Sequence, residues 1–147
     1  MPDQPIQVLL IEDSPTDVLL LRETLADVTT VQFALTAAER LGEGLKRLAE
    51  ARFDVVLLDL GLPDSQGLET FVKVHSQAPG VPCVVLTHLA DETLAVQAVR
   101  AGAQDYLVKA QARGDVLSRA IRYAVERKRA EAVLSASRAM FQQLFES

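Results

Sequence analysis

The 147-residue sequence has one cysteine, no apolar run near 18 residues in length, and no basic, apolar leader at its start. With Cys83 alone, the chain cannot form an intrachain disulfide or a cysteine-based metal site. Cys83 lies in the apolar run VPCVVL, so we expect it to be a small core residue. The lack of a long apolar run or leader argues against a membrane span and a signal peptide. We therefore expect a soluble, cytoplasmic protein, and no internal repeat or Gly/Ser linker divides it.

Charge is unevenly distributed along the chain, whose formal net charge is −5. Residues 1–112 hold 8 Lys/Arg and 16 Asp/Glu, a balance of −8, whereas residues 113–147 hold 7 and 4, a balance of +3. This pattern indicates an acidic body and a mildly basic tail. Because acids are interspersed in the tail, a solvated helix face is favoured over DNA binding. We do not expect nucleic acid to be a partner of this fragment.

Short apolar runs alternate with segments of helical period. Apolar residues make up 49% of the chain and charged residues 24%, which is typical of a globular domain with its own core. The predicted strands cover residues 6–11, 31–37, 53–59, 81–87 and 105–109. Five strand–helix units in succession predict an α/β fold, in which a five-stranded parallel, doubly wound sheet is covered by helices on both faces.

Helix signals follow each predicted strand. Ser14 can cap a first helix, and Asp17 lies near the positive end of its dipole. Asp64 and Asp91 are expected to cap the third and fourth helices. The fifth helix is predicted to begin near Asp115 and to continue almost to the end of the chain.

Polar residues stand where the apolar strands end. In a parallel sheet these carboxyl ends share one edge, and ligands bind beyond it. The residues at the ends of the first, third, fourth and fifth strands are Glu12, Asp13, Asp59, Thr87, His88 and Lys109. Three carboxylates gathered there would repel one another without a cation, and such a set suits Mg²⁺. Asp59, in the middle strand, is the natural nucleophile toward a phosphoryl group, whose oxygens Lys109 and Thr87 would contact.

In this order, Glu12-Asp13, Asp59, Leu62-Pro63-Asp64, Thr87, Tyr106 and Lys109 resemble the receiver domain of bacterial two-component response regulators, over residues 6–124. The resemblance implies the flavodoxin-like fold of chemotaxis regulators. It also implies phosphoryl transfer onto Asp59 from a histidine kinase or phosphotransfer protein, in a domain that assists its own phosphorylation and dephosphorylation.

The same resemblance implies roles for the other site residues. Glu12, Asp13, Asp59 and the carbonyl of Gly61 would hold Mg²⁺. Thr87 and Lys109 would hold the phosphoryl group, helped by the backbone N–H of His88. Thr87 and Tyr106 would move together as the switch.

Two features depart from the receiver pattern. His88 stands where receivers usually have a small residue, and its side chain would either crowd the site or remain a passive wall. Ala110 follows Lys109 where receivers commonly have proline in a cis peptide, and a non-proline cis bond costs about 2.5–4 kcal/mol. This departure leaves the geometry of the loop open, but not the role of Lys109.

Other functions are also considered. A phosphatase with an aspartate nucleophile, of the haloacid dehalogenase type, would need a second aspartate at the position of Gly61. A degenerate receiver would serve only as a protein-interaction module, which the retained polar residues do not favour. A nucleotide-binding flavodoxin-like protein would need a Gly-rich loop after the first strand, and none is present.

The last segment, 129–147, extends beyond what a receiver of residues 1–128 needs. Ala130, Leu134, Ser137, Phe141 and Leu144 recur at steps of 4, 3, 4 and 3, which is a short heptad seam. The segment resembles the connector helix that precedes a PAS sensory domain, so a sensory or output domain is expected to follow. A homodimer through this helix is one expectation, and a frayed tail is the alternative.

Overall fold

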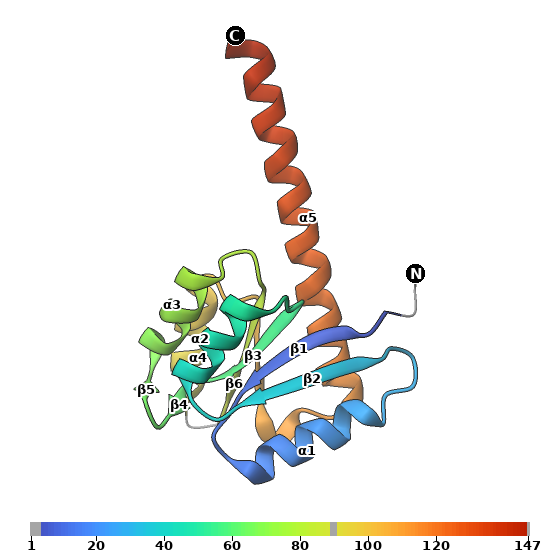
Figure 1. Cartoon of the computed structure of the whole chain (residues 1–147), viewed down its shortest axis with the longest axis vertical. Coiled ribbons are helices and arrows are strands. Elements are labelled where there is room, and N and C mark those ends of the chain that lie inside the picture. Colours follow the sequence, from blue (N-terminus) through green and yellow to red (C-terminus); the bar gives the residue numbers. More distant parts are fainter. Residues whose placement is uncertain (1–3, 89–90, 147) are drawn as a thin grey trace.

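The computed structural model describes residues 4–88 and 91–146 (Figure 1). Five parallel strands form its central sheet, in the order β2-β1-β3-β6-β7. Their bounds are β1 Ile6–Ile11, β2 Phe33–Ala38, β3 Val55–Asp59, β6 Cys83–Thr87 and β7 Asp105–Val108. The predicted doubly wound α/β fold is therefore confirmed, with strand bounds within two residues of those expected.

Helices cover both faces of this sheet (Figure 1). Their bounds are α1 Pro15–Ala26, α2 Leu41–Glu50, α3 Leu68–Gln77, α4 Glu92–Arg100 and α5 Gly114–Glu146. Two short strands, β4 Gly61–Leu62 and β5 Ser65–Gln66, form an antiparallel pair between β3 and α3. The 3-10 helix η2, Lys109–Gln111, links β7 to the loop before α5.

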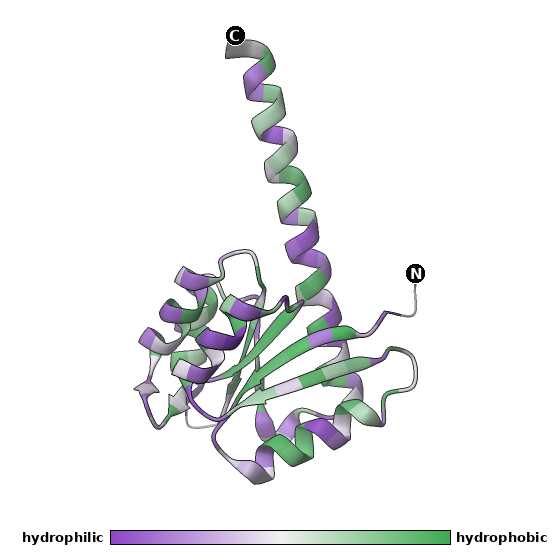
Figure 2. Ribbon diagram, in the orientation of Figure 1, coloured by the Kyte–Doolittle hydropathy of each residue, from purple (hydrophilic) through white to green (hydrophobic). Residues whose placement is uncertain are grey.

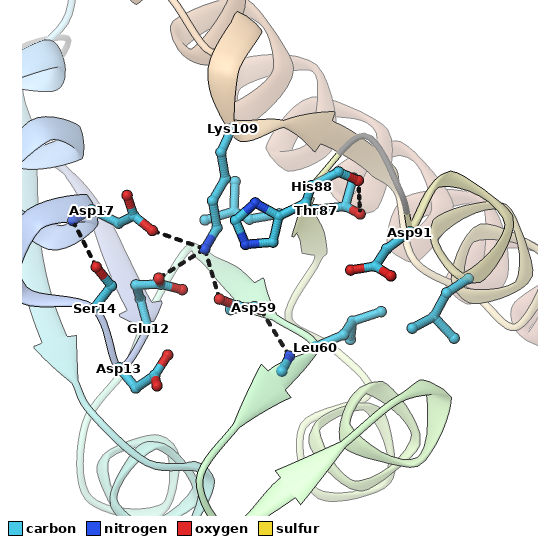
Figure 3. Close-up of a pocket in the computed structure, with 13 residues that line it drawn as sticks. Glu12, Asp13, Ser14, Asp17, Asp59, Leu60, Thr87, His88, Asp91 and Lys109 are labelled. Carbon is cyan, nitrogen blue, oxygen red and sulfur yellow. Dashed lines mark hydrogen bonds and ion pairs between the residues drawn. The ribbon is translucent and has the colours of Figure 1, made fainter.

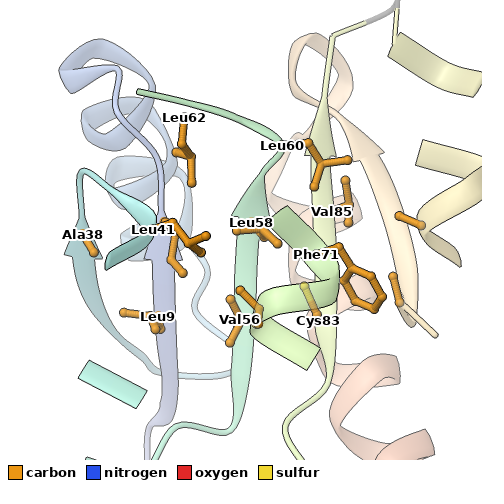
Figure 4. Close-up of a cluster of buried hydrophobic side chains, with 14 of the residues drawn as sticks. Leu9, Ala38, Leu41, Val56, Leu58, Leu60, Leu62, Phe71, Cys83 and Val85 are labelled. Carbon is orange, nitrogen blue, oxygen red and sulfur yellow. The ribbon is translucent and has the colours of Figure 1, made fainter. Parts of the chain in front are cut away.

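The core has two halves because successive side chains of each strand point to opposite faces of the sheet. In β1, Leu9 and Ile11 pack toward α2, α3 and α4, in the half that Figure 4 shows. Val8 and Leu10 pack instead toward α1 and α5. Since both faces are covered, the strands are mostly apolar, and Figure 2 shows them largely green. Cys83 is buried in the first half, as predicted.

Helix α5 has two unlike parts. Leu117, Ile121 and Ala124 are fully buried against the sheet. Every residue from 129 to 144 is exposed, and this part extends away from the body (Figure 1). Among the described residues, no helix, α5 included, combines the length and apolar character that a membrane span needs.

The two predicted acidic caps behave differently from expectation. Asp64 does not cap α3, which begins after Gly67. Its oxygens instead accept the N–H groups of Leu41 at 2.8 Å and Gly42 at 2.9 Å, at the start of α2. Asp91 occupies the position before α4 but makes no capping hydrogen bond. Sequence proximity suggested the nearest helix, whereas the β4–β5 turn carries Asp64 across to another one.

We expect Asp64→Ala to lower the free energy of unfolding by about 0.5–2 kcal/mol, because two N–H groups of α2 lose their acceptor. The same two donors lower the pKa of Asp64, so its contribution is complete above the ordinary value of 3.8 and is lost as the pH falls below it. Urea denaturation at neutral pH measures the difference. Asp91→Ala is the matched control, and an equal loss in both variants would contradict the capping role of Asp64.

Candidate functional site

A pocket of about 340 Å³ opens at the carboxyl edge of the sheet (Figure 3). The register pairs Ile11 with Leu58 and Asp59 with Leu86, so the residues after β1 and at the ends of β3 and β6 come together. Seven of the predicted site residues line this pocket: Glu12, Asp13, Asp59, Gly61, Thr87, His88 and Lys109. Tyr106 is not among the lining residues.

Lys109 joins the acids of the pocket through its ammonium group. Its Nζ donates to Asp59 Oδ2 at 2.7 Å, to Glu12 Oε1 at 2.8 Å and to Asp17 Oδ2 at 3.1 Å. An ammonium has three donors, so each one meets a different carboxylate. Burial alone would lower the pKa of Lys109, but Asp59 and Glu12 raise it above its usual range. Lys109 is therefore a fixed positive charge. The peptide bond that follows it, to Ala110, is trans.

Asp59 is buried yet ionised. Its Oδ1 accepts the backbone N–H of Gly61 at 2.8 Å, while its Oδ2 faces Lys109. Burial alone would raise the pKa of Asp59, but hydrogen bonds from Glu12, Lys109 and the Gly61 N–H lower it below its ordinary value. A carboxylate held in this state at neutral pH can act as a nucleophile.

Glu12 is the acid of the group whose ionised form is disfavoured. Burial, and then the neighbouring Asp59 carboxylate, raise the pKa of Glu12 to about 9. Its Oε2 is buried and has no hydrogen-bond partner among the described residues. A buried carboxyl oxygen without a partner is costly, and a cation beside it would remove that cost.

The donor set fits a magnesium ion. Glu12, Asp13 and Asp59 each offer a carboxylate oxygen, and these atoms lie within 4.8 Å of one another. Asp13 is exposed, so part of the coordination sphere faces water. Hard oxygen ligands with open water positions are what Mg²⁺ takes in proteins. Together with the unpartnered Glu12 oxygen, this agrees with the prediction of an acidic metal-binding cluster.

The hydroxyl groups of Thr87 and Tyr106 have different hydrogen-bond partners in this structure. The hydroxyl of Thr87 donates to the carbonyl of His88 at 2.8 Å. The hydroxyl of Tyr106 donates to Glu92 at 3.1 Å at the molecular surface, and this bond raises the pKa of Tyr106. The imidazole of His88 lies beside Lys109 at the mouth of the pocket (Figure 3).

Sequence reasoning missed Asp17 as a site residue. Ser14 caps α1 as predicted, with its Oγ accepting the N–H of Asp17 at 3.3 Å. The Asp17 side chain then turns into the pocket and reaches Lys109 (Figure 3). Burial would raise its pKa, but Lys109 and Glu12 lower it on balance. The signal in the sequence was an acid in the first helical turn after a strand end, which we interpreted only as a helix-dipole effect.

The family model of the response regulator receiver domain matches residues 8–121. The KDP operon transcriptional regulatory protein KdpE of Escherichia coli K12 is 40% identical over 90 residues, which are 61% of this chain and 39% of that protein. The chain thus spans about two-fifths of the length of this relative.

Solved structures share the fold. The signal receiver domain of an HD domain-containing protein from Pseudomonas fluorescens Pf-5 superposes with a TM-score of 0.77 at 25% identity, covering 90% of this chain and 94% of that one. The receiver domain of the sensor histidine kinase PA1611 from Pseudomonas aeruginosa PAO1 gives 0.70 at 22%, covering 84% and 99%. That structure holds a magnesium ion in its active site cleft.

Proposed function

The chain belongs to the response regulator receiver domain family and serves phosphorylation-dependent signalling, and we propose that Asp59 is its phosphoacceptor. One observation carries this assignment: Asp59 is an ionised, buried carboxylate fixed between the Lys109 ammonium and the Gly61 N–H. The family is one of signalling phosphoacceptors, so neither the phosphatase nor the pure interaction module is favoured.

In the proposed reaction, an Asp59 carboxylate oxygen forms a bond to phosphorus. The phosphorus–nitrogen bond of a phosphohistidine donor breaks, and its electron pair stays on the imidazole nitrogen. Lys109, already 2.7 Å from Asp59 Oδ2, meets the negative charge that the phosphoryl oxygens bring. The domain in this way assists its own phosphorylation.

Magnesium completes the proposed site. Glu12, Asp13, Asp59 and the carbonyl of Gly61 would hold Mg²⁺, which supplies positive charge to the phosphoryl oxygens when bound. Support comes from the close group of three carboxylates and from the buried, unpartnered oxygen of Glu12.

The proposed switch uses hydroxyl groups that have other partners at rest. Thr87 would exchange the His88 carbonyl for a phosphoryl oxygen, alongside the His88 N–H. Tyr106 would leave Glu92 and move into the space beside Thr87. The Thr87 hydroxyl now bonds to a neutral carbonyl, and the Tyr106 hydroxyl bonds to Glu92 at the surface. Exchanging either hydrogen bond for another costs little free energy.

The partners would be a histidine kinase or phosphotransfer protein, in the cytoplasm. We divide the chain into a receiver at 1–128 and a connector helix at 129–147 that leads to an attached or partner output domain. KdpE is a transcriptional regulatory protein by name. Nucleic acid is not a proposed partner of this fragment.

The exposed part of α5 is proposed to pair with the same helix of a second chain. Leu134 and Leu144 are 52% and 72% exposed, and they share the heptad seam with Ala130 and Ser137. Val133 and Met140, 70% and 67% exposed, widen this apolar face. Burying each large apolar side chain is worth about 1.5–3 kcal/mol, which favours association over exposure.

Acetyl phosphate with Mg²⁺ should label the chain at Asp59. Asp59→Asn should abolish the labelling, because the amide is not a nucleophile, and EDTA should abolish it in the parent. Lys109→Ala should still bind Mg²⁺ but lose most of the labelling. Mass spectrometry after proteolysis locates the phosphoryl group, and finding it on another residue would refute the assignment.

His88→Ala should change the rates of phosphorylation by acetyl phosphate or of phosphoryl loss several-fold, because the ring stands at the mouth of the pocket. His75→Ala is the matched control, since His75 stacks on Phe71 with ring centroids 5.4 Å apart and is not among the residues that line the pocket. Time courses of labelling and decay measure both. Equal rates in the parent and His88→Ala would make His88 a bystander.

Sedimentation tests the proposed dimer. The full chain should associate at tens of micromolar, whereas a chain ending at Arg129 should be monomeric. Leu134→Asp should weaken association at least roughly tenfold, because a seam leucine is lost. Ser135→Asp, one position off the seam, is the control. Monomers for every chain, with and without phosphorylation, would exclude a helix dimer.

A further inference from the structure

Asp17 is a fourth carboxylate at the pocket, and neither the metal cluster nor the phosphoacceptor role uses it. Its Oδ2 lies 3.1 Å from Lys109 Nζ, and its side chain is 30% exposed. Among the described residues, the carboxylates close enough to share one cation are Glu12, Asp13 and Asp59. Asp17 lies outside that group, so its charge is directed at Lys109.

The position of Asp17 is fixed by α1. Ser14 caps the helix and accepts the N–H of Asp17 at 3.3 Å, which holds the residue in the first turn. From there the carboxylate approaches Lys109 from the α1 side, opposite the side on which His88 lies (Figure 3). Asp17 and Asp59 therefore both contact Lys109, and among the described residues no hydrogen bond joins their two side chains.

Phosphorylation of Asp59 would change the hydrogen-bond acceptors that surround the Lys109 ammonium. At rest, its three donors take one oxygen each from Asp59, Glu12 and Asp17. After transfer, the phosphoryl oxygens offer Lys109 new acceptors with more negative charge than the carboxylate they replace. Asp17 then no longer supplies a required acceptor, yet it remains an anion beside a group of like charge.

We propose that Asp17 is a positioning residue that holds Lys109 in its resting place and opposes the phosphorylated state of Asp59. The inference rests on the proposed function, since it assigns a regulation to the same site. Asp17 would then limit the extent of Asp59 phosphorylation and the lifetime of the phosphoryl group. The longest of the three Lys109 contacts is the one to be given up.

Beryllofluoride, a stable mimic of the phosphoryl group, tests the proposal by titration calorimetry on the full chain with Mg²⁺ present. Asp17→Asn removes the charge and keeps the shape. The variant should bind beryllofluoride roughly 3- to 10-fold more tightly, since one like charge is gone, and this gain should shrink as KCl is raised. The phosphoryl group placed by acetyl phosphate should also decay more slowly.

A second titration separates charge from damage to the fold. Removing an anion should weaken Mg²⁺ binding modestly while it strengthens beryllofluoride binding, whereas a distorted site would weaken both. Asp17→Glu should behave like the parent, because the longer carboxylate still reaches Lys109. Asp115→Asn is the matched control, since Asp115 is a first-turn acid of α5 that pairs only at 3.9 Å with Arg113 on the surface.

The outcomes are distinguishable. Unchanged or weaker beryllofluoride binding in Asp17→Asn, with a normal parent, overturns the role of Asp17 and leaves the proposed function intact. Equal tightening in Asp115→Asn reduces the effect to net charge and also overturns it. A parent that binds Mg²⁺ but neither binds beryllofluoride nor accepts phosphoryl from acetyl phosphate overturns the proposed function and this inference together.

Discussion

The contact of one ammonium with three carboxylates governs this molecule. Lys109 Nζ lies within 3.1 Å of oxygens from Glu12, Asp17 and Asp59, and the Lys109 side chain is only 11% exposed. One ammonium does not neutralise three acidic groups, and buried charge without a partner costs several kcal/mol or more. Any arriving cation or anion must therefore rearrange the same few hydrogen bonds. The proposed response to a phosphoryl group would therefore begin at this contact.

The sheet holds the residues of that contact in place. Leu57 and Leu58 are fully buried, and the strand they belong to ends at Asp59, so the carboxylate cannot retreat from the edge. Parallel pairing sets β1, β3, β6 and β7 in register, which brings residues 97 positions apart into hydrogen-bond contact. Apolar packing on both faces stabilises a sheet edge that electrostatics alone would push apart.

The fold and most of the site could be predicted because both depend on local patterns. Apolar runs predicted the strands, and the polar residues that end them predicted Glu12, Asp59 and Lys109 as neighbours. Two things could not be predicted. Asp64 caps α2 across 23 residues, which depends on the path of the β4–β5 turn. Asp17 enters the site through a side-chain direction, and an acid in a first helical turn has an ordinary explanation that needs no partner.

Lys109 of the site lies close in sequence to the start of the long helix α5. Lys109 begins η2, and Gly114 begins α5, so only four residues lie between Lys109 and the start of a 33-residue helix. The buried part of α5, with Leu117 and Ile121, packs in the same core half as Val84 and Leu86 of β6, the strand that ends at Thr87. Helical hydrogen bonds continue from this part into the exposed residues 129–144. A displacement of the buried turns would therefore move the exposed turns and their apolar face, because both parts belong to one continuous helix.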